Sequence, residues 1–333
     1  MNAAFLERAM HEAGELASLP QTLAEVLRVL RDERSSADQL ALVLIKDPPL
    51  TAKVLRMANS PIYGIGQRIG SMIQAIRVLG DRQVTALALS ATVYDLTQDW
   101  SSSLDRMRFW RHSLETAIAS RMIGESLGRK STEELFLAGL LHDLGLLVLG
   151  KMEPQEFARI WNEAGRESEV VEMEVQLWGT THAEIGGYLL RKWHLPETIC
   201  QPVDQHHDGA ILDKAEPDLV ASQILMLGHM ISKFRIVPEK GILNADALLA
   251  MESLRLTLGI PAEQLVDIEK ELTSTTMAEA DYLEMNIGTI DDLLLEANRL
   301  LFEQSIAVER LANENRRLRR RLQKQHADTE SVT

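Results

Sequence analysis

The chain has 333 residues, of which 45% are hydrophobic and 25% are charged, and its formal net charge is −14. This composition is typical of a globular protein with a substantial core, and the negative charge argues against broad electrostatic attachment to nucleic acid or anionic lipid. Cys200 is the only cysteine, so neither an internal disulfide nor a cysteine zinc cluster can form.

The hydropathy pattern predicts neither a secretory signal nor a membrane span. The segment from Met1 to Leu19 carries Glu7, Glu12 and Glu15 and lacks an apolar run, unlike a secretory signal. No stretch reaches the roughly 20 uninterrupted apolar residues that a membrane span needs. We therefore expect a cytoplasmic protein that contacts no membrane.

Residues 15–97 have helical periodicity and are predicted to form a small helical subdomain. Ser36 followed by Gln39 indicates a helix start, and Asp47-Pro48-Pro49 opens another helix because proline suits the first helical positions. Polar residues near the helix ends fit caps and solvated faces, with a docking surface as the alternative; they are Asp47, Lys53, Arg56 and Asn59.

The stretch Leu135–Gly150 organises the next predicted subdomain, residues 98–235. It follows a helix-start signal, Ser131 with Glu134, and is apolar at nearly every position, so we expect one helix buried on all sides. His142 and Asp143 lie inside it. A buried carboxylate is costly unless it is paired, and the pair alone fits a metal site and an ordinary hydrogen-bonded core equally well.

The other histidines favour a metal site. Seven of the nine histidines fall within this one span: His112, His142, His182, His194, His206, His207 and His229. Several helices that each contribute a histidine can build a metal site in a helical domain. Thr181 and Glu184 form a capping box, which predicts His182 in the first turn of a helix.

Three of these histidines are expected to differ from the others. His206 and His207 are adjacent, so on a helix they point about 100° apart and are not expected to bind one ion equivalently. His194 lies in a helix-terminating Trp-His-Leu-Pro sequence and is expected to be structural.

An ordered set of motifs over roughly residues 15–235 resembles the HDOD family, the output-domain branch of the HD metal-dependent phosphohydrolase superfamily. The matching motifs are Leu19-Pro20, Asp47-Pro48-Pro49-Leu50, Asn59-Ser60, Ala75-Ile76-Arg77-Val78-Leu79-Gly80, Phe109-Trp110-Arg111-His112-Ser113, Ala138-Gly139-Leu140-Leu141-His142-Asp143-Leu144-Gly145, His182-Ala183-Glu184-Ile185-Gly186, Trp193-His194-Leu195-Pro196 and His206-His207. The resemblance implies an all-α fold. It also implies a pocket for one or two divalent ions of the iron, manganese or zinc class, although the ions can be absent. The implied ligands are His112, His142, Asp143, His182 and one or both of His206 and His207.

Two departures from the hydrolase pattern favour a regulatory module over an enzyme. His229 stands where HD hydrolases carry a late aspartate; it could still bind an ion and is a tentative ligand, but the change removes a negative charge. His206-His207-Asp208-Gly209 is not followed by Gly-Tyr-Pro. HDOD proteins are regarded as signalling outputs, so the expectation is a signal-transduction module with a retained or vestigial metal pocket. The alternative is a phosphohydrolase acting on a nucleotide or cyclic dinucleotide, in which Asp143 is the catalytic candidate.

The C-terminal third is predicted to contain a helical extension, residues 236–285, and a coiled-coil helix, residues 286–325. A heptad pattern begins at Ile287 and predicts a homodimer; its dimerisation positions include Leu294, Leu301, Val308, Leu311, Asn315, Leu318 and Leu322. The alternative is one amphipathic helix packed on its own domain. The basic run Arg316–Lys324 fits a solvated coiled-coil flank, with a nucleic-acid or acidic-partner contact as the sharper hypothesis. A signalling protein is a further expected partner.

Overall fold

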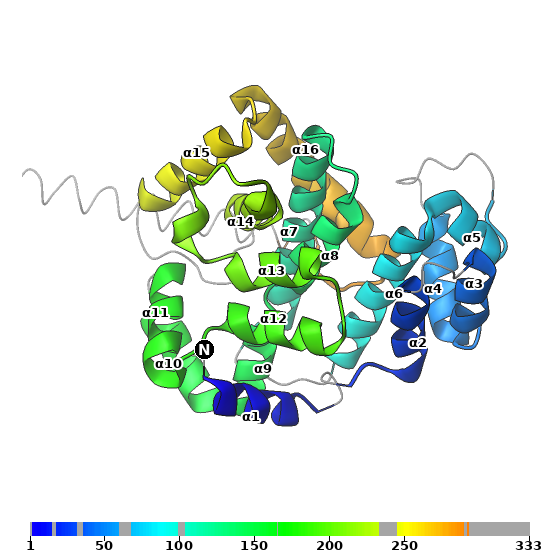
Figure 1. Cartoon of the computed structure of the whole chain (residues 1–333), viewed down its shortest axis with the longest axis horizontal. Helices are drawn as coiled ribbons and strands as arrows, with labels where there is room; N and C mark the ends of the chain where they lie inside the picture. Colours follow the sequence, from blue (N-terminus) through cyan, green and yellow to red (C-terminus); the bar gives the residue numbers. More distant parts are fainter. Residues whose placement is uncertain are drawn as a thin grey trace, which may run out of the picture.

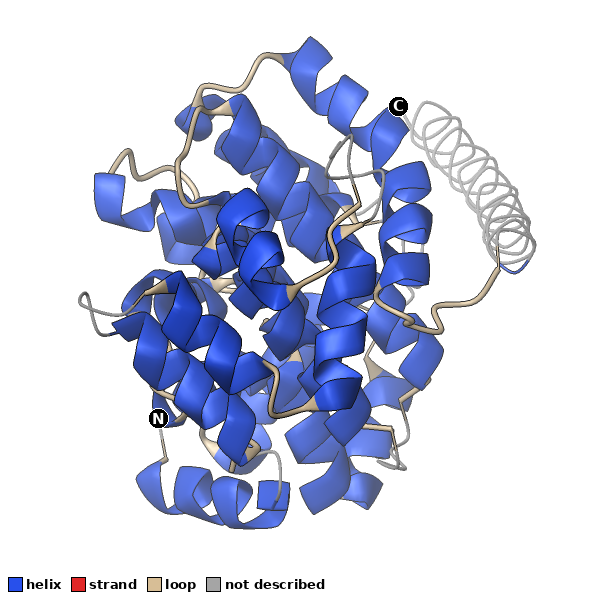
Figure 2. Ribbon diagram, turned by 90° about the vertical axis from the view of Figure 1, so that its right-hand side faces the viewer, coloured by secondary structure: helices blue, strands red, loops and turns tan. Residues whose placement is uncertain are grey.

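The computed structural model describes residues 2–14, 18–31, 36–59, 68–98, 104–164, 166–232, 245–289 and 292. Every regular element in these ranges is a helix, and the ribbons in Figures 1 and 2 show the helices packed around one another. The predicted all-α class is therefore confirmed. The predicted coiled-coil positions Leu294–Leu322 and the basic run Arg316–Lys324 lie outside the described residues.

The N-terminal helices divide into two groups. Helices α2–α6 gather at one end of the molecule (Figure 1), and they span Gln21–Arg31, Ala37–Leu44, Pro48–Ala58, Met72–Leu79 and Asp81–Leu96. The helix before them, α1 (Ala3–Ala13), packs instead against α9 and α12 of the other group. The predicted starts at Ser36 and Asp47 are confirmed: Ser36 and Gln39 form a capping box, and Asp47 caps α4 with prolines at its first positions.

The larger group of helices surrounds α7 and α8. Its helices are α7 (Arg106–Ser126), α8 (Thr132–Leu141), α9 (Leu144–Met152), α10 (Pro154–Glu163), α11 (Glu167–Trp178), α12 (His182–Lys192), α13 (Glu197–Gln205) and α14 (Val220–Ile231), with 3-10 turns η3 (Gly209–Ile211) and η4 (Pro217–Leu219). Two further helices, α15 (Ala245–Leu258) and α16 (Ala262–Tyr282), pack against α14 and α7 respectively.

Small residues let helices α7, α8 and α14 approach closely. A Cβ on Gly139 of α8 would lie 2.5 Å from the Ala117 Cα of α7. A Cβ on Gly228 of α14 would lie 2.6 Å from the Ser120 hydroxyl of α7. Backbones this close leave no room for larger side chains, and the approach brings the histidines of α7, of the turn after α8 and of α14 within reach of one another.

The prediction of one continuous helix over Leu135–Gly150 is wrong. Helix α8 ends at Leu141, a turn follows at His142 and Asp143, and α9 begins at Leu144. The turn lies where α9 approaches the start of α12: a Cβ on Gly145 would be 2.0 Å from the His182 carbonyl oxygen. Adjacent side chains on a regular helix point about 100° apart, whereas here His142 Nε2 lies 3.1 Å from Asp143 Oδ2.

The predicted helix start at Ser131 is correct in position, but Ser131 makes no side-chain cap. Its hydroxyl accepts a hydrogen bond from Arg82, which also pairs with Glu134 at 3.0 Å. The apolar stretch Thr132–Met152 is long enough to cross a membrane by length and composition, yet 89% of its most apolar window is buried inside the fold. It therefore forms the core of the helical domain.

Replacing Gly139 with alanine is expected to lower the free energy of unfolding by about 1–3 kcal/mol, because the new methyl group overlaps the Ala117 backbone and α7 and α8 must separate. Urea denaturation followed by circular dichroism measures this change. Gly70→Ala is the control, since nothing lies within 4 Å of its added Cβ. Equal effects of the two substitutions would contradict the close-approach argument.

Candidate metal centre

The predicted ligand residues come together at the centre of the larger helical group. His112 lies on α7, His142 and Asp143 form the turn between α8 and α9, and His182 begins α12. His206 and His207 follow the last residue of α13, and His229 lies on α14. His194 is not part of this group; it is exposed at the end of α12 with φ 60°, in agreement with the structural role predicted for it.

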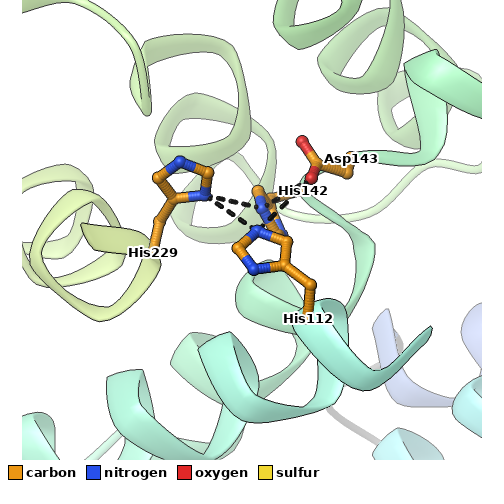
Figure 3. A group of neighbouring side chains, drawn as sticks. All are labelled: His112, His142, Asp143 and His229. Atoms are coloured by element: carbon orange, nitrogen blue, oxygen red, sulfur yellow. Dashed lines mark hydrogen bonds and ion pairs between the residues drawn. The ribbon is translucent and has the colours of Figure 1, made fainter. Parts of the chain in front are cut away.

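One half of the centre contains three imidazoles and one carboxylate oxygen (Figure 3). His229 Nδ1 lies 3.1 Å from both His112 Nε2 and His142 Nε2. Asp143 Oδ2 lies 3.1 Å from His142 Nε2 and 3.6 Å from His112 Nε2. We call this group, His112, His142, His229 and Asp143 Oδ2, half-site A.

The other carboxylate oxygen faces a second trio of imidazoles. Asp143 Oδ1 lies 3.5 Å from His182 Nε2 and 3.5 Å from His206 Nε2. His207 Nε2 lies 3.0 Å from His182 Nε2. We call this group, His182, His206, His207 and Asp143 Oδ1, half-site B. The prediction that His206 and His207 would not serve one ion alike is therefore wrong, because both lie in the turn after α13 and not on a regular helix. Asp143 is thus shared by both half-sites, and each half-site has four donor atoms within 4.8 Å of one another.

Outer hydrogen bonds set the proton positions in half-site B. The Nδ1–H of His206 donates to the Val203 carbonyl at 2.7 Å. His182 donates from Nδ1–H to the Glu174 carboxylate at 2.8 Å, and its backbone N–H donates to the same carboxylate at 2.9 Å. Carbonyl and carboxylate oxygens only accept, so each Nε2 carries a lone pair toward Asp143 when the imidazole is neutral.

Half-site A is arranged in the same way. His142 Nδ1–H donates to the Gly139 carbonyl at 2.7 Å. His112 Nδ1–H donates to the Ser232 hydroxyl, which in turn donates to Glu115 at 2.9 Å. His229 differs because its Nε2 faces Glu167 at 2.9 Å, which leaves Nδ1 as the nitrogen directed at the centre.

These lone pairs point at one another and need a cation between them. Neither oxygen of Asp143 has a hydrogen-bond partner among the described residues, although the residue is only 1% exposed. His142 Nε2, the nearest nitrogen, carries no proton in the tautomer that Gly139 favours. Ligands 2.0–2.1 Å from one ion lie roughly 2.9–3.4 Å apart in octahedral or tetrahedral geometry, and the nitrogen separations of 3.0–3.1 Å match this spacing. The residues therefore fit a divalent metal ion in each half-site.

The pKa directions also suit metal binding. Burial tends to raise the pKa of Asp143, but the neighbouring imidazoles outweigh it and hold this pKa well below its ordinary value. Burial and neighbouring imidazoles lower the pKa values of His112 and His207, and burial lowers that of His206. Burial acts against protonation of His182, yet Glu174 raises its pKa to about 9. A metal at half-site B must therefore displace a proton from His182 at neutral pH.

The sequence interpretation missed the residues that support the ligands. Glu167, Glu174 and Ser232 contact imidazole nitrogens through the hydrogen bonds and ion pair above, and Glu115 accepts a hydrogen bond from Ser232. Helix α11 alternates glutamates with apolar residues, a pattern typical of a surface helix with one solvated face. The sequence carried only a weak signal for Glu174: it lies seven residues before Thr181, the start of the capping box that positions His182.

A cavity of about 380 Å³ opens beside the centre. His206, His207 and His229 line its floor, and Arg166 and Asp246 lie on its wall. Solvent and small molecules can therefore reach the ligand atoms from one side.

Comparisons with known proteins agree with this architecture. The HDOD domain family matches residues 16–209 of the chain. An uncharacterized protein of Treponema pallidum (strain Nichols) is 23% identical over 196 residues, which cover 58% of this chain and 38% of that protein. The chain thus spans well under half the length of this curated relative.

Solved structures share the fold. An HDOD domain protein of unknown function from Geobacter sulfurreducens is 24% identical, with a TM-score of 0.68 over 84% of this chain and 97% of that one. A candidate phosphohydrolase from Shewanella amazonensis SB2B is also 24% identical, with a TM-score of 0.66 over 84% of this chain and 98% of that one. At this identity the likeness establishes the fold alone.

Replacing Asp143 with asparagine is expected to remove metal from both half-sites, because this carboxylate is the anionic ligand that they share. Equilibrium dialysis against zinc or manganese, followed by elemental analysis, gives the number of ions per chain. Asp213→Asn, a change at an exposed aspartate, is the control and should retain the metal. Full metal content in the Asp143 variant would contradict the assignment of the centre.

Replacing Glu174 with glutamine is expected to weaken metal binding about 10–100-fold at half-site B and to leave half-site A unchanged, because only His182 loses its carboxylate partner. Calorimetric titration with zinc separates the two affinities. Glu163→Gln, at the exposed end of α10, is the control. An equal loss of affinity at both half-sites would show that Glu174 acts through general folding.

Proposed function

Because the chain belongs to the HDOD family, we propose that it is a signal-transduction module whose core is organised by two bound divalent metal ions. One observation carries the metal assignment: ring nitrogens of six imidazoles, five of them buried, and both oxygens of the buried Asp143 converge at ligand spacing. His112, His142, His229 and Asp143 would hold one ion, and His182, His206, His207 and Asp143 the other. Imidazole and carboxylate donors suit zinc, iron or manganese.

Two features support regulation over hydrolysis. Position 229 offers an imidazole in place of a further carboxylate, so Asp143 is the one carboxylate in the two half-sites, and a hydrolytic pair of ions would be held less tightly than by two carboxylates. The cavity wall beside the centre carries Glu172 and Asp246 together with Glu167. These carboxylates disfavour the approach of a phosphate ester.

A contact beside the centre offers a route to the C-terminal part of the chain. Arg111 precedes His112 on α7, is 2% exposed, and donates its Nε–H to the carbonyl of Ile287. The Asn286 backbone N–H donates to the Tyr94 hydroxyl at 2.8 Å. We propose that metal loading at His112 alters the segment 283–289 and that this segment passes the change to residues beyond it.

Hydrogen exchange of the full chain tests this proposal. Zinc loading is expected to slow exchange in residues 283–289, and the Asp143→Asn chain should show no such change. A metal-free protein with an intact fold, or identical exchange with and without metal, would contradict the proposal.

A phosphohydrolase is the second candidate, supported by the open cavity over the centre, where Arg166 and Ser168 stand at the start of α11. Bound metal would supply a water of lowered pKa. The metal-loaded chain would be assayed on cyclic dinucleotides and nucleotide phosphates, and we expect no turnover above the metal-free control. Metal-dependent turnover that Asp143→Asn abolishes would establish the enzyme instead.

We further propose a cytoplasmic homodimer that pairs through the heptad positions Leu294–Leu322. The prediction that the coiled coil begins at Ile287 is wrong, because residues 286–289 are not helical and Ile287, 2% exposed, packs in the core of its own chain. The support is the heptad pattern, with Asn315 as the polar core position that fixes register in two-stranded coils. Light scattering of the full chain is expected to give the dimer mass, and Leu301→Asp together with Leu318→Asp should give the monomer. A dimer that persists in this double variant would reject the proposed seam.

A further inference from the structure

A second cavity lies away from the metal centre, where α2 and α6 meet α8 and the turn between α12 and α13. Its volume is about 360 Å³, and it shares no lining residue with the cavity over the metal ligands. Cavities of this size commonly accept small organic molecules. It adjoins helices of both groups, so a ligand there would contact both.

One wall of the second cavity is apolar. Its lining side chains are Leu27, Leu30, Leu137, Leu195, Pro196 and Ile199. The end of α12 helps to build this wall, since His194 adopts φ 60°, a conformation rare for residues other than glycine, and the chain then turns into Leu195 and Pro196. A flat apolar surface of this kind suits the face of an aromatic ring.

Two polar atoms at the cavity have no partner among the described residues. They are the Thr85 hydroxyl oxygen, in a residue that is 3% exposed, and Oε2 of Glu133. Buried polar groups in native proteins are almost always hydrogen-bonded, so both atoms call for a ligand group. Burial, together with Glu279 and Glu125, raises the pKa of Glu133 to about 7 despite the opposing effect of Arg121. A donor that reached this carboxyl would relieve that cost.

Two arginines stand at the cavity. Arg31 is exposed, and its Nε–H donates to the Leu27 carbonyl at 3.3 Å, which holds the guanidinium near the rim. Arg82 lies beside it in the lining and pairs with Glu134. Guanidinium groups bind phosphate oxygens well. The cavity thus offers an apolar wall, a hydroxyl, the imidazole of His194, the carboxyl groups of Asp81, Glu133 and Glu134, and two guanidinium groups, of which that of Arg82 is paired with Glu134.

We propose that this cavity binds a purine nucleotide, with the base against the apolar wall, the base edge at Glu133 and Thr85, and the phosphate at Arg31. Guanine is the better match, because its ring N–H and exocyclic amino group can donate two parallel hydrogen bonds to one carboxylate, whereas adenine offers a single amino group beside an acceptor nitrogen. The site is independent of the metal centre and does not rest on the function proposed for that centre.

Calorimetry of the full chain tests this proposal with GMP, AMP, guanosine and inorganic phosphate as probes. We expect GMP to bind more tightly than AMP, guanosine to bind more weakly than GMP, and phosphate alone to bind far more weakly still. Thr85→Val and Glu133→Gln should each weaken GMP binding about ten- to hundred-fold, since each removes a hydrogen bond to a buried group. Asp143→Asn, which alters the metal centre, should leave GMP binding unchanged.

A further variant tests whether misfolding, and not loss of the site, explains a loss of GMP binding. Leu30 is partly buried at this cavity, so Leu30→Trp is expected to fill the space and abolish GMP binding while the helical circular dichroism stays unchanged. The proposal is overturned if no probe binds, or if GMP binds equally to the wild type and to all three cavity variants. Loss of GMP binding in Asp143→Asn alone would place the nucleotide at the metal centre and would also overturn it.

Discussion

The fold depends on how it accommodates one buried charge, the carboxylate of Asp143. This side chain is 1% exposed and has no hydrogen-bond partner among the described residues, and an isolated charge in such surroundings is very costly. Imidazoles from α7, the α8–α9 turn, α12, the end of α13 and α14 surround the carboxylate, and a divalent ion held between these groups would neutralise its charge. The packing of these helices is therefore tied to the chemistry at their common centre.

The glycines that let the helices approach closely also help to position the imidazoles. Gly139 lets α8 lie against α7, and the carbonyl of the same residue accepts the proton of His142 Nδ1. Gly145 lets α9 approach the start of α12, where His182 stands. A side chain at either glycine would shift the backbone that positions a ligand, so packing errors here would appear first as lost metal affinity.

The sequence predicted the features that depend on local chemistry or on an ordered set of motifs. The capping boxes at Ser36 and Thr181 formed as expected, because the partners of a cap lie three residues apart. Clustering of the histidines was also anticipated, from their number in one span and from the resemblance to HDOD proteins. The break at His142 was missed because its cause, the approach of Gly145 to the His182 carbonyl, joins residues far apart in the chain. Glu174 was missed because the glutamates of α11 look like those of a solvated helix.

Sharing Asp143 between the half-sites would make their metal occupancies interdependent. The first ion to bind would be partly neutralised by this carboxylate, so the second ion would meet a weakened ligand and the repulsion of the first. Thermodynamic linkage requires the penalty to be the same in either order of binding. Such anticooperative sites fill over a wider range of metal concentration than independent sites of equal affinity, with a singly loaded form dominant in between. A protein built on this arrangement has three distinct states of charge at its core, and the free metal concentration selects among them.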